Sequence, residues 1–517
     1  MDFDETPSKL VPREFLAVVL AGFGNELQPL TSSHGEEPCP KALLPIANKP
    51  MIDYPLTWLE QSGISDVLLI CPTAHRASIS HHISDISSSS YLSLRIDLQA
   101  YEESHELAVG TCTVLRHFAH RIGKDFILIP CDFVPPPSLP LSTLINKFRI
   151  ESKLDGAITV SCWFQRPDGG SVPEEWGQPA PPVPIVWDKR SGTLLHVDTP
   201  DDVDRNGEEL ELRMSLFSKY PKTSLSSRFQ DSHVYVCKRA VIDILQQKPL
   251  FDSFREEFLP WLCKLQYQKT KQFKYGRDIH SASQNAPHSL ALRHSSLYTG
   301  KTTMKWPSSP QDEVDSPPQK VATLSAPSSP VDNHDGIMGP PASLRVGVVV
   351  HETGVTGRAN NLATLLELNR HFLTQTAWTL PTDPENRILI DPKSKISNDS
   401  MIGQSTRVGE RALVKYSVIG KHCVIGRMVK IVGCVIFDHC VIEDGAKLDG
   451  CILGLNTKVG AKAELARCLT QAGYEVDAGG VHRHEKLEVS DWAAASNATD
   501  SDDHDSSDAA SETTDEE

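Results

Sequence analysis

The chain has 517 residues, of which 39% are hydrophobic, and its 51 Lys and Arg against 67 Asp and Glu give a formal net charge of −16. This length exceeds what one hydrophobic core normally supports, so two or three domains are expected. Eleven acidic residues and no Lys or Arg follow Lys486, so the C-terminal tail supplies most of the imbalance. The rest shows no clustered Lys/Arg face, which argues against a nucleic-acid-binding protein.

The N-terminal stretch and the cysteines bear on the compartment. MDFDETPSKLVPREF contains acidic residues and no apolar core, unlike a secretory signal, and no apolar run approaches the roughly 18 residues of a membrane-spanning helix. The 12 cysteines form no CxxC pair. We therefore expect reduced thiols in a cytosolic protein, with no membrane and no DNA as partner.

Residues 15–135 alternate short apolar runs with helix-length segments, from FLAVVLAG at 15–22 to DFILIPCDF at 125–133. Strands rich in Val, Ile and Leu that alternate with helices predict βαβ units and a mainly parallel sheet covered on both faces. Further strand-like runs continue to about residue 271. The sequence therefore predicts a doubly wound α/β domain.

Between about residues 281 and 343 this pattern gives way to Ser, Pro, His and Gln, with three Ser-Pro steps at Ser309, Ser316 and Ser329. Such a segment cannot bury enough apolar area to offset its ordering entropy, so we expect a disordered insertion. Proline-directed phosphorylation is an alternative to a plain loop. LRVGVVVH at 344–351 then resumes a strand pattern, and ANNLATLLELNRHFL at 359–373 a helical one.

The most regular pattern of the chain lies in its C-terminal third. Apolar residues recur in steps of six, six and five, which makes a repeat of 17 residues, at Ile402, Val408, Val414, Ile419, Ile425, Ile431, Ile436, Ile442, Leu448, Leu453, Val459 and Leu465. Small residues lie four positions after many of these, as at Thr406, Ala412, Cys423, Cys440, Ala446, Thr457 and Ala463. Three short strands per coil predict a parallel β-helix of hexapeptide repeats. Such β-helices are known to wind left-handed.

The same repeat accounts for five cysteines. Cys423 and Cys440 are one repeat apart, and Cys434, Cys451 and Cys468 form a second series. They are predicted to stack in columns inside the coil. A metal cluster is an alternative to stacked small core residues, which we favour.

The loop after the first strand, LAGFGNELQPL at 20–30, poses the functional question. A strand that ends in Gly-x-Gly and turns toward a helix typically aims backbone N–H groups at a phosphate. Together with PKALLPI at 40–46, KPMIDY at 49–54 and the β-helix, this loop resembles the sugar-phosphate nucleotidyltransferases. The resemblance implies a residual nucleotide site at Gly22, Gly24, Lys41, Gly110 and Thr111, with Asp132 as a vestigial Mg²⁺ ligand.

Four departures from that family lie in the same site. Asn25 and Glu26 replace the Thr and Arg of the family loop, so a guanidinium is lost and a carboxylate is added, with Glu36 and Glu37 further on. The D-x-G motif that supplies a second Mg²⁺ ligand has no Asp in the stretch 350–354. The Glu-Lys-Pro sugar motif is absent, and 231–233 read Asp-Ser-His in place of Asn-x-Gly. These changes predict a fold that has lost its transfer chemistry, with no catalytic residues and no required cofactor.

Three further blocks, at 212–237, 254–266 and 359–370, are not shared with active pyrophosphorylases and resemble the gamma-subunit family of eukaryotic translation initiation factor 2B. The resemblance implies a regulatory subunit of the guanine-nucleotide exchange factor for initiation factor 2. It also implies pairing with the epsilon subunit and a decamer with alpha, beta and delta subunits. The epsilon subunit adds a helical-repeat exchange domain, and we expect none here, because the β-helix runs into an acidic tail.

Two other functions stay open. Lys41, Asp132 and the β-helix also fit an active sugar-1-phosphate nucleotidyltransferase, for example one that makes GDP-mannose. A third candidate is a nucleotide sensor that binds GTP or another nucleotide without turnover. The expected organisation is an N-terminal arm (1–13), a nucleotidyltransferase-like domain (14–280) with a disordered insertion (281–343), the end of the α/β domain (344–384), a left-handed β-helix (385–472) and a disordered acidic tail (473–517).

Overall fold

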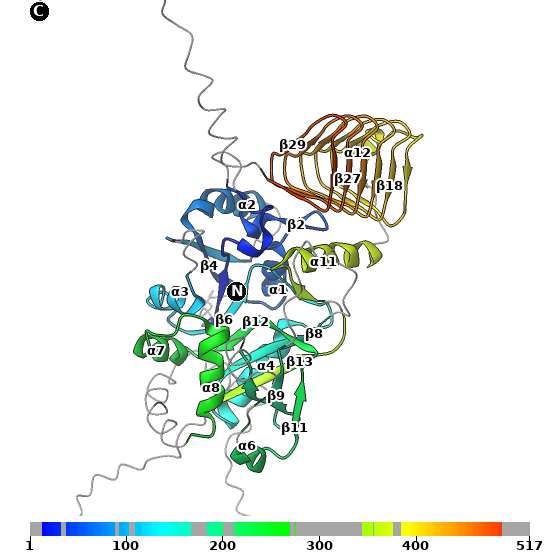
Figure 1. Cartoon of the computed structure of the whole chain (residues 1–517). Coiled ribbons are helices and arrows are strands. Elements are labelled where there is room, and N and C mark those ends of the chain that lie inside the picture. The colour runs from blue at the N-terminus through cyan, green and yellow to red at the C-terminus, as the bar shows by residue number, and fades with distance from the viewer. Residues whose placement is uncertain are drawn as a thin grey trace, which may run out of the picture.

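The computed structural model of the chain (Figure 1) describes residues 13–32, 38–87, 93–102, 109–166, 183–199, 210, 212, 214–268, 275, 344–354, 356–375 and 384–488. The predicted insertion, most of the N-terminal arm and the last 29 residues of the predicted tail lie outside these ranges, as do Glu36 and Glu37. No helix among the described residues is long and apolar enough to cross a membrane.

A ten-stranded sheet forms the centre of the N-terminal domain, with the strand order β11-β9-β10-β13-β8-β12-β6-β1-β4-β5. The strands are β1 (Phe15–Leu20), β4 (Asp66–Pro72), β5 (Arg95–Tyr101), β6 (Asp125–Pro130), β8 (Ala157–Gln165), β9 (Ile185–Asp188), β10 (Thr193–Val197), β11 (Thr223–Ser226), β12 (Phe229–Cys237) and β13 (Arg345–His351).

The pairing within this sheet is mixed. β6, β1, β4 and β5 are mutually parallel, as are β8 and β13, whereas β12 runs antiparallel to both its neighbours and β10 pairs antiparallel with β9 and β13. The short turn between β9 and β10 allows only an antiparallel pair, because a parallel connection needs a long crossover. β13 lies between β10 and β8, so the chain after residue 344 adds a strand to the interior of this sheet.

Helices cover both faces of the sheet, because successive residues of a strand point to opposite sides. Val18 packs in one apolar cluster with residues of α3 (Thr111–His117), α7 (Ala240–Gln247) and α8 (Leu259–Leu265). Ala17 and Val19 pack in the other with residues of α1 (Asp53–Gln61), α2 (Arg76–Ser87) and α4 (Leu141–Leu154). The doubly wound arrangement is therefore confirmed.

The C-terminal domain is a parallel β-helix with three faces. One face contains β15 (Lys395–Ile396), β18 (Leu413–Lys415), β21 (Lys430–Val432), β24 (Lys447–Asp449), β27 (Glu464–Ala466) and β30 (Val481–Arg483). The second contains β16 (Met401–Ile402), β19 (Val418–Ile419), β22 (Val435–Ile436), β25 (Ile452–Leu453), β28 (Leu469–Thr470) and β31 (Lys486–Leu487), and the third β17 (Arg407–Val408), β20 (Val424–Ile425), β23 (Val441–Ile442), β26 (Lys458–Val459) and β29 (Glu475–Val476). Paired residues are 17 apart, as the repeat predicts.

The C-terminal boundary of the β-helix differs from the predicted one. The coil continues past residue 472 through β29, β30 and β31, so the segment 473–488 is part of the β-helix and not of a disordered tail. The spacing of inward positions continues, but Thr470 and His482 occupy two of them, His482 pairing with Leu465. Polar residues at these positions interrupt the apolar pattern on which the prediction relied.

The two predicted cysteine columns are present in the β-helix interior. The backbone N–H of Cys451 faces Sγ of Cys434 at 3.4 Å, and that of Cys468 faces Sγ of Cys451 at the same distance. Cys423 and Cys440 are fully buried in the same core. Small side chains are needed here because each coil lies directly on the next.

Thiol labelling should therefore be slow in the native protein. All 12 cysteines are buried, and burial raises the pKa of Cys71 to about 11 and those of Cys131 and Cys162 to about 12. Since the thiolate is the reactive form, a maleimide at mildly alkaline pH should modify the native chain far more slowly than the urea-unfolded chain, as counted by mass spectrometry. Rapid native labelling of the β-helix cysteines would contradict their placement.

The two domains meet along an apolar seam that has three parts. The β-helix contributes the outward side chains Val418, Val435, Phe437, Ile452 and Leu469. The other two parts are Leu362, Leu365 and Leu366 of α11 (Leu362–Gln375) and Leu27, Leu30, Leu44 and Ile46 of the N-terminal domain. In Figure 1, α11 runs between the sheet domain and the β-helix. Asn48 Nδ2 donates to the carbonyl of Ile419 at 2.8 Å, and Asn369 Oδ1 accepts from the N–H of Ala47 at 2.8 Å. The β-helix is thus packed against the segments that follow the first loop.

Candidate functional site

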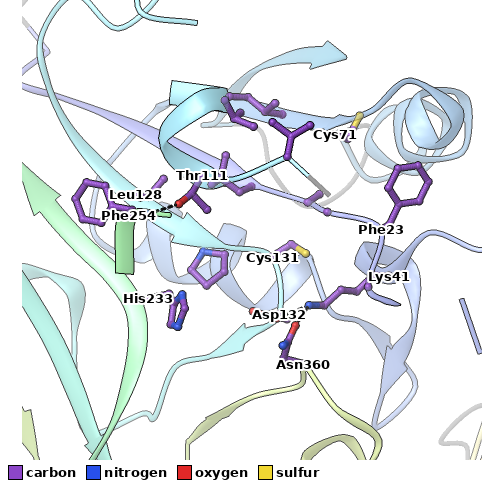
Figure 2. Close-up of a pocket in the computed structure, with 18 of the residues that line it drawn as sticks. Phe23, Lys41, Cys71, Thr111, Leu128, Cys131, Asp132, His233, Phe254 and Asn360 are labelled. Carbon is purple, nitrogen blue, oxygen red and sulfur yellow. Dashed lines mark hydrogen bonds and ion pairs between the residues drawn. The ribbon is translucent and has the colours of Figure 1, made fainter. Parts of the chain in front are cut away.

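A pocket of about 330 Å³ opens beyond the carboxyl ends of β1, β4 and β6. This is the edge at which doubly wound sheets bind ligands. One part of its lining is apolar and includes Leu20, Ile70, Val109, Val114, Leu128 and Phe254. The other part is polar and includes Lys41, Asp132, His233, Arg255, Arg358 and Asn360. Figure 2 shows Leu128 and Phe254 at one side of the pocket and Lys41, Asp132 and Asn360 together at another.

The first loop supplies two glycines to this pocket for different reasons. Gly22 is exposed and has nothing within 4 Å of a Cβ position, so a ligand can reach its backbone. Gly24 has φ +82°, and a Cβ there would lie 2.8 Å from the Lys41 side chain. Only glycine therefore combines the left-handed backbone with the close approach of Lys41.

The two residues after Gly24 differ in their position relative to the pocket. Asn25 lines the pocket, but Glu26, in the short turn η1 (Asn25–Leu27), is exposed and is not among the lining residues. The carboxylate that the sequence adds at position 26 is therefore not part of the pocket wall. The loss of the guanidinium and the hydroxyl at these two positions remains.

Lys41 and Asp132 are brought together with two residues that the sequence had not indicated. Lys41 lies in η2 (Lys41–Leu43), and its Nζ donates to Asp132 Oδ2 and to Asn360 Oδ1, each at 2.5 Å. Arg358, in β14 (Gly357–Arg358), forms a two-pronged pair, with Nε 3.0 Å from Asp132 Oδ1 and Nη2 3.0 Å from Oδ2. β14 pairs with β7 (Phe133–Val134), which directly follows Asp132.

The neighbouring charges determine the ionisation state of the Asp132 carboxyl group. Burial raises the pKa of Asp132, but the charges of Arg358 and Lys41 and their hydrogen bonds lower it further, so the net pKa lies well below its usual range. The side chain of Asp132 is 1% exposed and that of Lys41 is 7% exposed. The carboxylate is therefore ionised at neutral pH and is neutralised by two cations of its own chain.

The residues do not fit the Mg²⁺ that the resemblance implies. Mg²⁺ needs open oxygen ligands, whereas both oxygens of Asp132 accept hydrogen bonds from cations. The stretch 350–354, expected to correspond to the D-x-G motif, does not line the pocket, and His351 Nε2 contacts Ser138 Oγ at 3.0 Å. The lining instead contains Arg358 and Asn360, spaced like the Asp and Gly of that motif. Arg358 thus puts a cation at the spacing at which the family motif has its carboxylate.

Gly110 and Thr111 differ in their position relative to the pocket. Thr111 lines the pocket, and its Oγ1 accepts from the N–H of Phe254 at 2.8 Å. Gly110 is not in the lining. Its N–H donates to Asp252 Oδ1 at 3.1 Å, and a Cβ at Gly110 would lie 2.3 Å from the carboxyl carbon of Asp252. Gly110 therefore serves to let the 250–254 loop approach α3.

The segment that replaces Asn-x-Gly also reaches the site. His233 lines the pocket with a left-handed φ of 56°, and burial together with Arg358 and Arg255 lowers its pKa well below the usual value, so the ring is neutral. Asp231 accepts from Tyr235 Oη at 2.5 Å and pairs with Arg255 Nε at 3.0 Å. Ser232 turns away and donates to the carbonyl of Cys162 at 2.7 Å.

Five of the residues singled out from the sequence line the pocket, namely Gly22, Gly24, Lys41, Thr111 and Asp132, and the lining also contains Arg255, Arg358 and Asn360, which were not predicted. Arg358 directly precedes the block at 359–370 and Asn360 lies within it, just before α11 begins at Leu362; that block indicates a helix and a family resemblance but no site residue. The cationic Arg358 at a strand end next to that block was the available signal.

The fold and the pocket define a class, that of nucleotidyltransferase-like proteins with a hexapeptide β-helix. A nucleotidyl transferase family model matches residues 16–163, and a model described as the EIF2B subunit epsilon LbH domain matches residues 384–480.

Full-length relatives narrow the class further. The chain is 31% identical over 482 residues to translation initiation factor eIF2B subunit gamma of Schizosaccharomyces pombe, which covers 92% of this chain and 90% of the relative. The gamma subunit of Dictyostelium discoideum is 24% identical, over 78% of this chain and 87% of its own. The epsilon subunit of the same organism is 24% identical over 48% of this chain and 33% of its own. The chain belongs to the family of eIF2B gamma subunits, which confirms the predicted resemblance.

Proposed function

We propose that this chain is a non-catalytic, regulatory subunit of the cytosolic guanine-nucleotide exchange factor for translation initiation factor 2. In this role it pairs with the epsilon subunit to form the catalytic subcomplex and stimulates GDP/GTP exchange. It joins the alpha, beta and delta subunits in a decamer. Membership of the gamma-subunit family supports the assembly. The enclosure of Asp132 by Lys41 and Arg358 is the observation that supports the proposed absence of nucleotidyl transfer.

The physical reason lies in what nucleotidyl transfer demands. Charge that develops as pyrophosphate leaves must be stabilised by donors and cations placed for the transition state. Here the buried cation Lys41 and the guanidinium of Arg358 are already paired with Asp132, and Asn25 stands where the family has a hydroxyl. The competing proposal of an active nucleotidyltransferase requires these pairs to open and a metal ion to enter.

Copurification and exchange kinetics test the assembly. The tagged full-length chain should retain the epsilon subunit from cell extract. The rate of GDP release from initiation factor 2 should be higher with epsilon and this chain than with epsilon alone. A solitary homo-oligomer that leaves the epsilon-driven rate unchanged would overturn the proposal.

A second proposal concerns the pocket itself, since a cavity of about 330 Å³ with an apolar and a polar part is retained. We propose that it binds GTP or another nucleotide without turnover and that no cofactor is required. Gly22 exposes its backbone there, and Lys41 and Thr111 reach the lining. Calorimetric titration with GTP, GDP and ATP should show saturable binding, whereas no heat with any of the three would indicate an empty pocket.

A further inference from the structure

The polar part of the pocket carries an excess of positive charge. Among its described lining residues, Lys41, Arg255 and Arg358 are cations, whereas Asp132 is the only carboxylate. Asp231 lies just behind the lining and pairs with Arg255. Because His233 is neutral, three cations face two carboxylates. A partly buried polar site with one uncompensated positive charge favours an anionic ligand.

Arg358 has the position and the geometry of a substitute for a metal ion. Its guanidinium binds both oxygens of Asp132 at 3.0 Å, and its side chain is 15% exposed. A bidentate pair fixes the plane of the guanidinium. It uses Nε and Nη2 and leaves further N–H donors of a five-donor group for a ligand. A divalent cation at Asp132 would have to displace this group and lie beside Lys41, against the repulsion of like charges.

Arg255 adds a donor that the protein leaves unused. Its Nη1 is buried and has no hydrogen-bond partner among the described residues, although Nε pairs with Asp231 at 3.0 Å. The guanidinium also lies 5.2 Å from the ring centre of Trp163, which holds its plane. An unsatisfied buried donor is costly unless a ligand completes it. Phosphate oxygens are the acceptors that suit two neighbouring guanidinium groups.

We propose that Arg358 takes the place of a divalent cation, so that the pocket binds a nucleoside phosphate in metal-free form, with the phosphate group on Arg358 and Arg255. The base then lies against the apolar lining around Leu128 and Phe254. This inference rests on the retained ligand pocket proposed above and not on the assembly with other subunits. In this inference, Arg358 and Arg255 bind the phosphate by themselves, without a metal ion.

Calorimetry with GDP on the full-length chain tests the inference, in excess EDTA and in excess Mg²⁺. Wild type should bind GDP with the same affinity in both. Arg358→Gln should weaken binding in EDTA by roughly 10-fold or more, since it removes a charge-assisted contact. Part of this loss should return with Mg²⁺, because the metal ion can then approach Asp132. Arg255→Gln should weaken binding equally in both buffers.

A matched control removes one positive charge outside the pocket. Arg239 pairs with Asp243 on α7, and Arg239→Gln should leave GDP binding unchanged in both buffers. The wild-type comparison needs no variant, so it decides the question even if Arg358→Gln does not fold. Binding of GDP by wild type only in Mg²⁺ would overturn the metal-free site and leave the ligand pocket standing. An absence of binding in both buffers would overturn both, without bearing on copurification with epsilon.

Discussion

Asp132→Asn should lower the free energy of unfolding by about 3–5 kcal/mol, which is the cost of leaving buried cations without their counter-charge. Lys41 and Arg358 both depend on this carboxylate, and its side chain is 1% exposed. Urea unfolding followed by tryptophan fluorescence measures the loss, since Trp58, Trp163 and Trp187 lie in the same domain. We expect Asp132→Asn to destabilise the α/β domain more than it destabilises the β-helix.

A surface pair supplies the control for Asp132→Asn. Asp97 pairs with Arg121, and their side chains are 49% and 41% exposed. Asp97→Asn should therefore change stability by about 1 kcal/mol or less. Equal effects at the two positions would contradict the buried charge cluster.

The difference in stability between wild type and Asp132→Asn should depend on pH, with a definite sign. The pKa of Asp132 is held well below its usual range in the folded chain, whereas a free Asp has a pKa of about 3.9. The carboxylate therefore stabilises the fold above about pH 4, and this contribution is lost as the pH falls further. The gap between wild type and Asp132→Asn should stay constant from neutral pH down to about pH 4 and should close below it.

Ile452→Glu should separate the β-helix from the α/β domain. Ile452 is fully buried in the seam on the outward face of β25, so a carboxylate there loses its water without a partner. The cost is on the order of 4 kcal/mol or more. We expect the backbone amides of α11 to lose protection in hydrogen exchange while those of the inner β-helix strands keep it.

An equivalent substitution on another face of the β-helix is the control for Ile452→Glu. Val424 also points outward, from β20, but it is 42% exposed. Val424→Glu should leave the protection of α11 unchanged, because the charge stays in water. Loss of protection in both variants would mean that the β-helix itself has unfolded and that the seam is not the cause.

The sequence predicted what local patterns encode. Steps of six, six and five placed residues such as Ile419, Ile436 and Leu453 inside the coil, and all three are at most 1% exposed. The apolar runs placed the parallel strands around β1, and Gly22, Lys41 and Asp132 followed from the loops at their ends. These features depend on residues close together in the chain, so their spacing alone carries the information.

What the sequence missed depends on long-range contacts. Arg358 binds Asp132 across 226 positions of the chain and lies beyond the insertion. Arg255 comes from η5 (Phe254–Phe258), the helical turn directly before α8, and no spacing rule relates it to Asp231. Glu26 is exposed and outside the pocket lining although it follows Asn25 directly, which a motif comparison does not show. The extent of the β-helix was underestimated because Thr470 and His482 took apolar positions.

Lys41 and Arg358 relate differently to the nucleotidyltransferase resemblance. Lys41 keeps the place that the nucleotidyltransferase resemblance assigns to it, but its ammonium group is bound to Asp132 and Asn360 of its own chain. Arg358 brings a fixed positive charge to the carboxylate that would hold a metal ion. Under our proposal, a pocket built in this way binds an anion and offers no open site for the metal-assisted transfer of a nucleotidyl group.

Pyrophosphate release tests the central claim most directly. The full-length chain, copurified with its epsilon partner, is incubated with Mg²⁺, GTP or ATP, and mannose or glucose 1-phosphate, beside the same complex carrying Lys41→Ala. We predict that the wild-type chain releases no more pyrophosphate than the Lys41→Ala chain with any substrate pair. Sugar-phosphate-dependent release that disappears in Lys41→Ala would show an active nucleotidyltransferase and contradict the account.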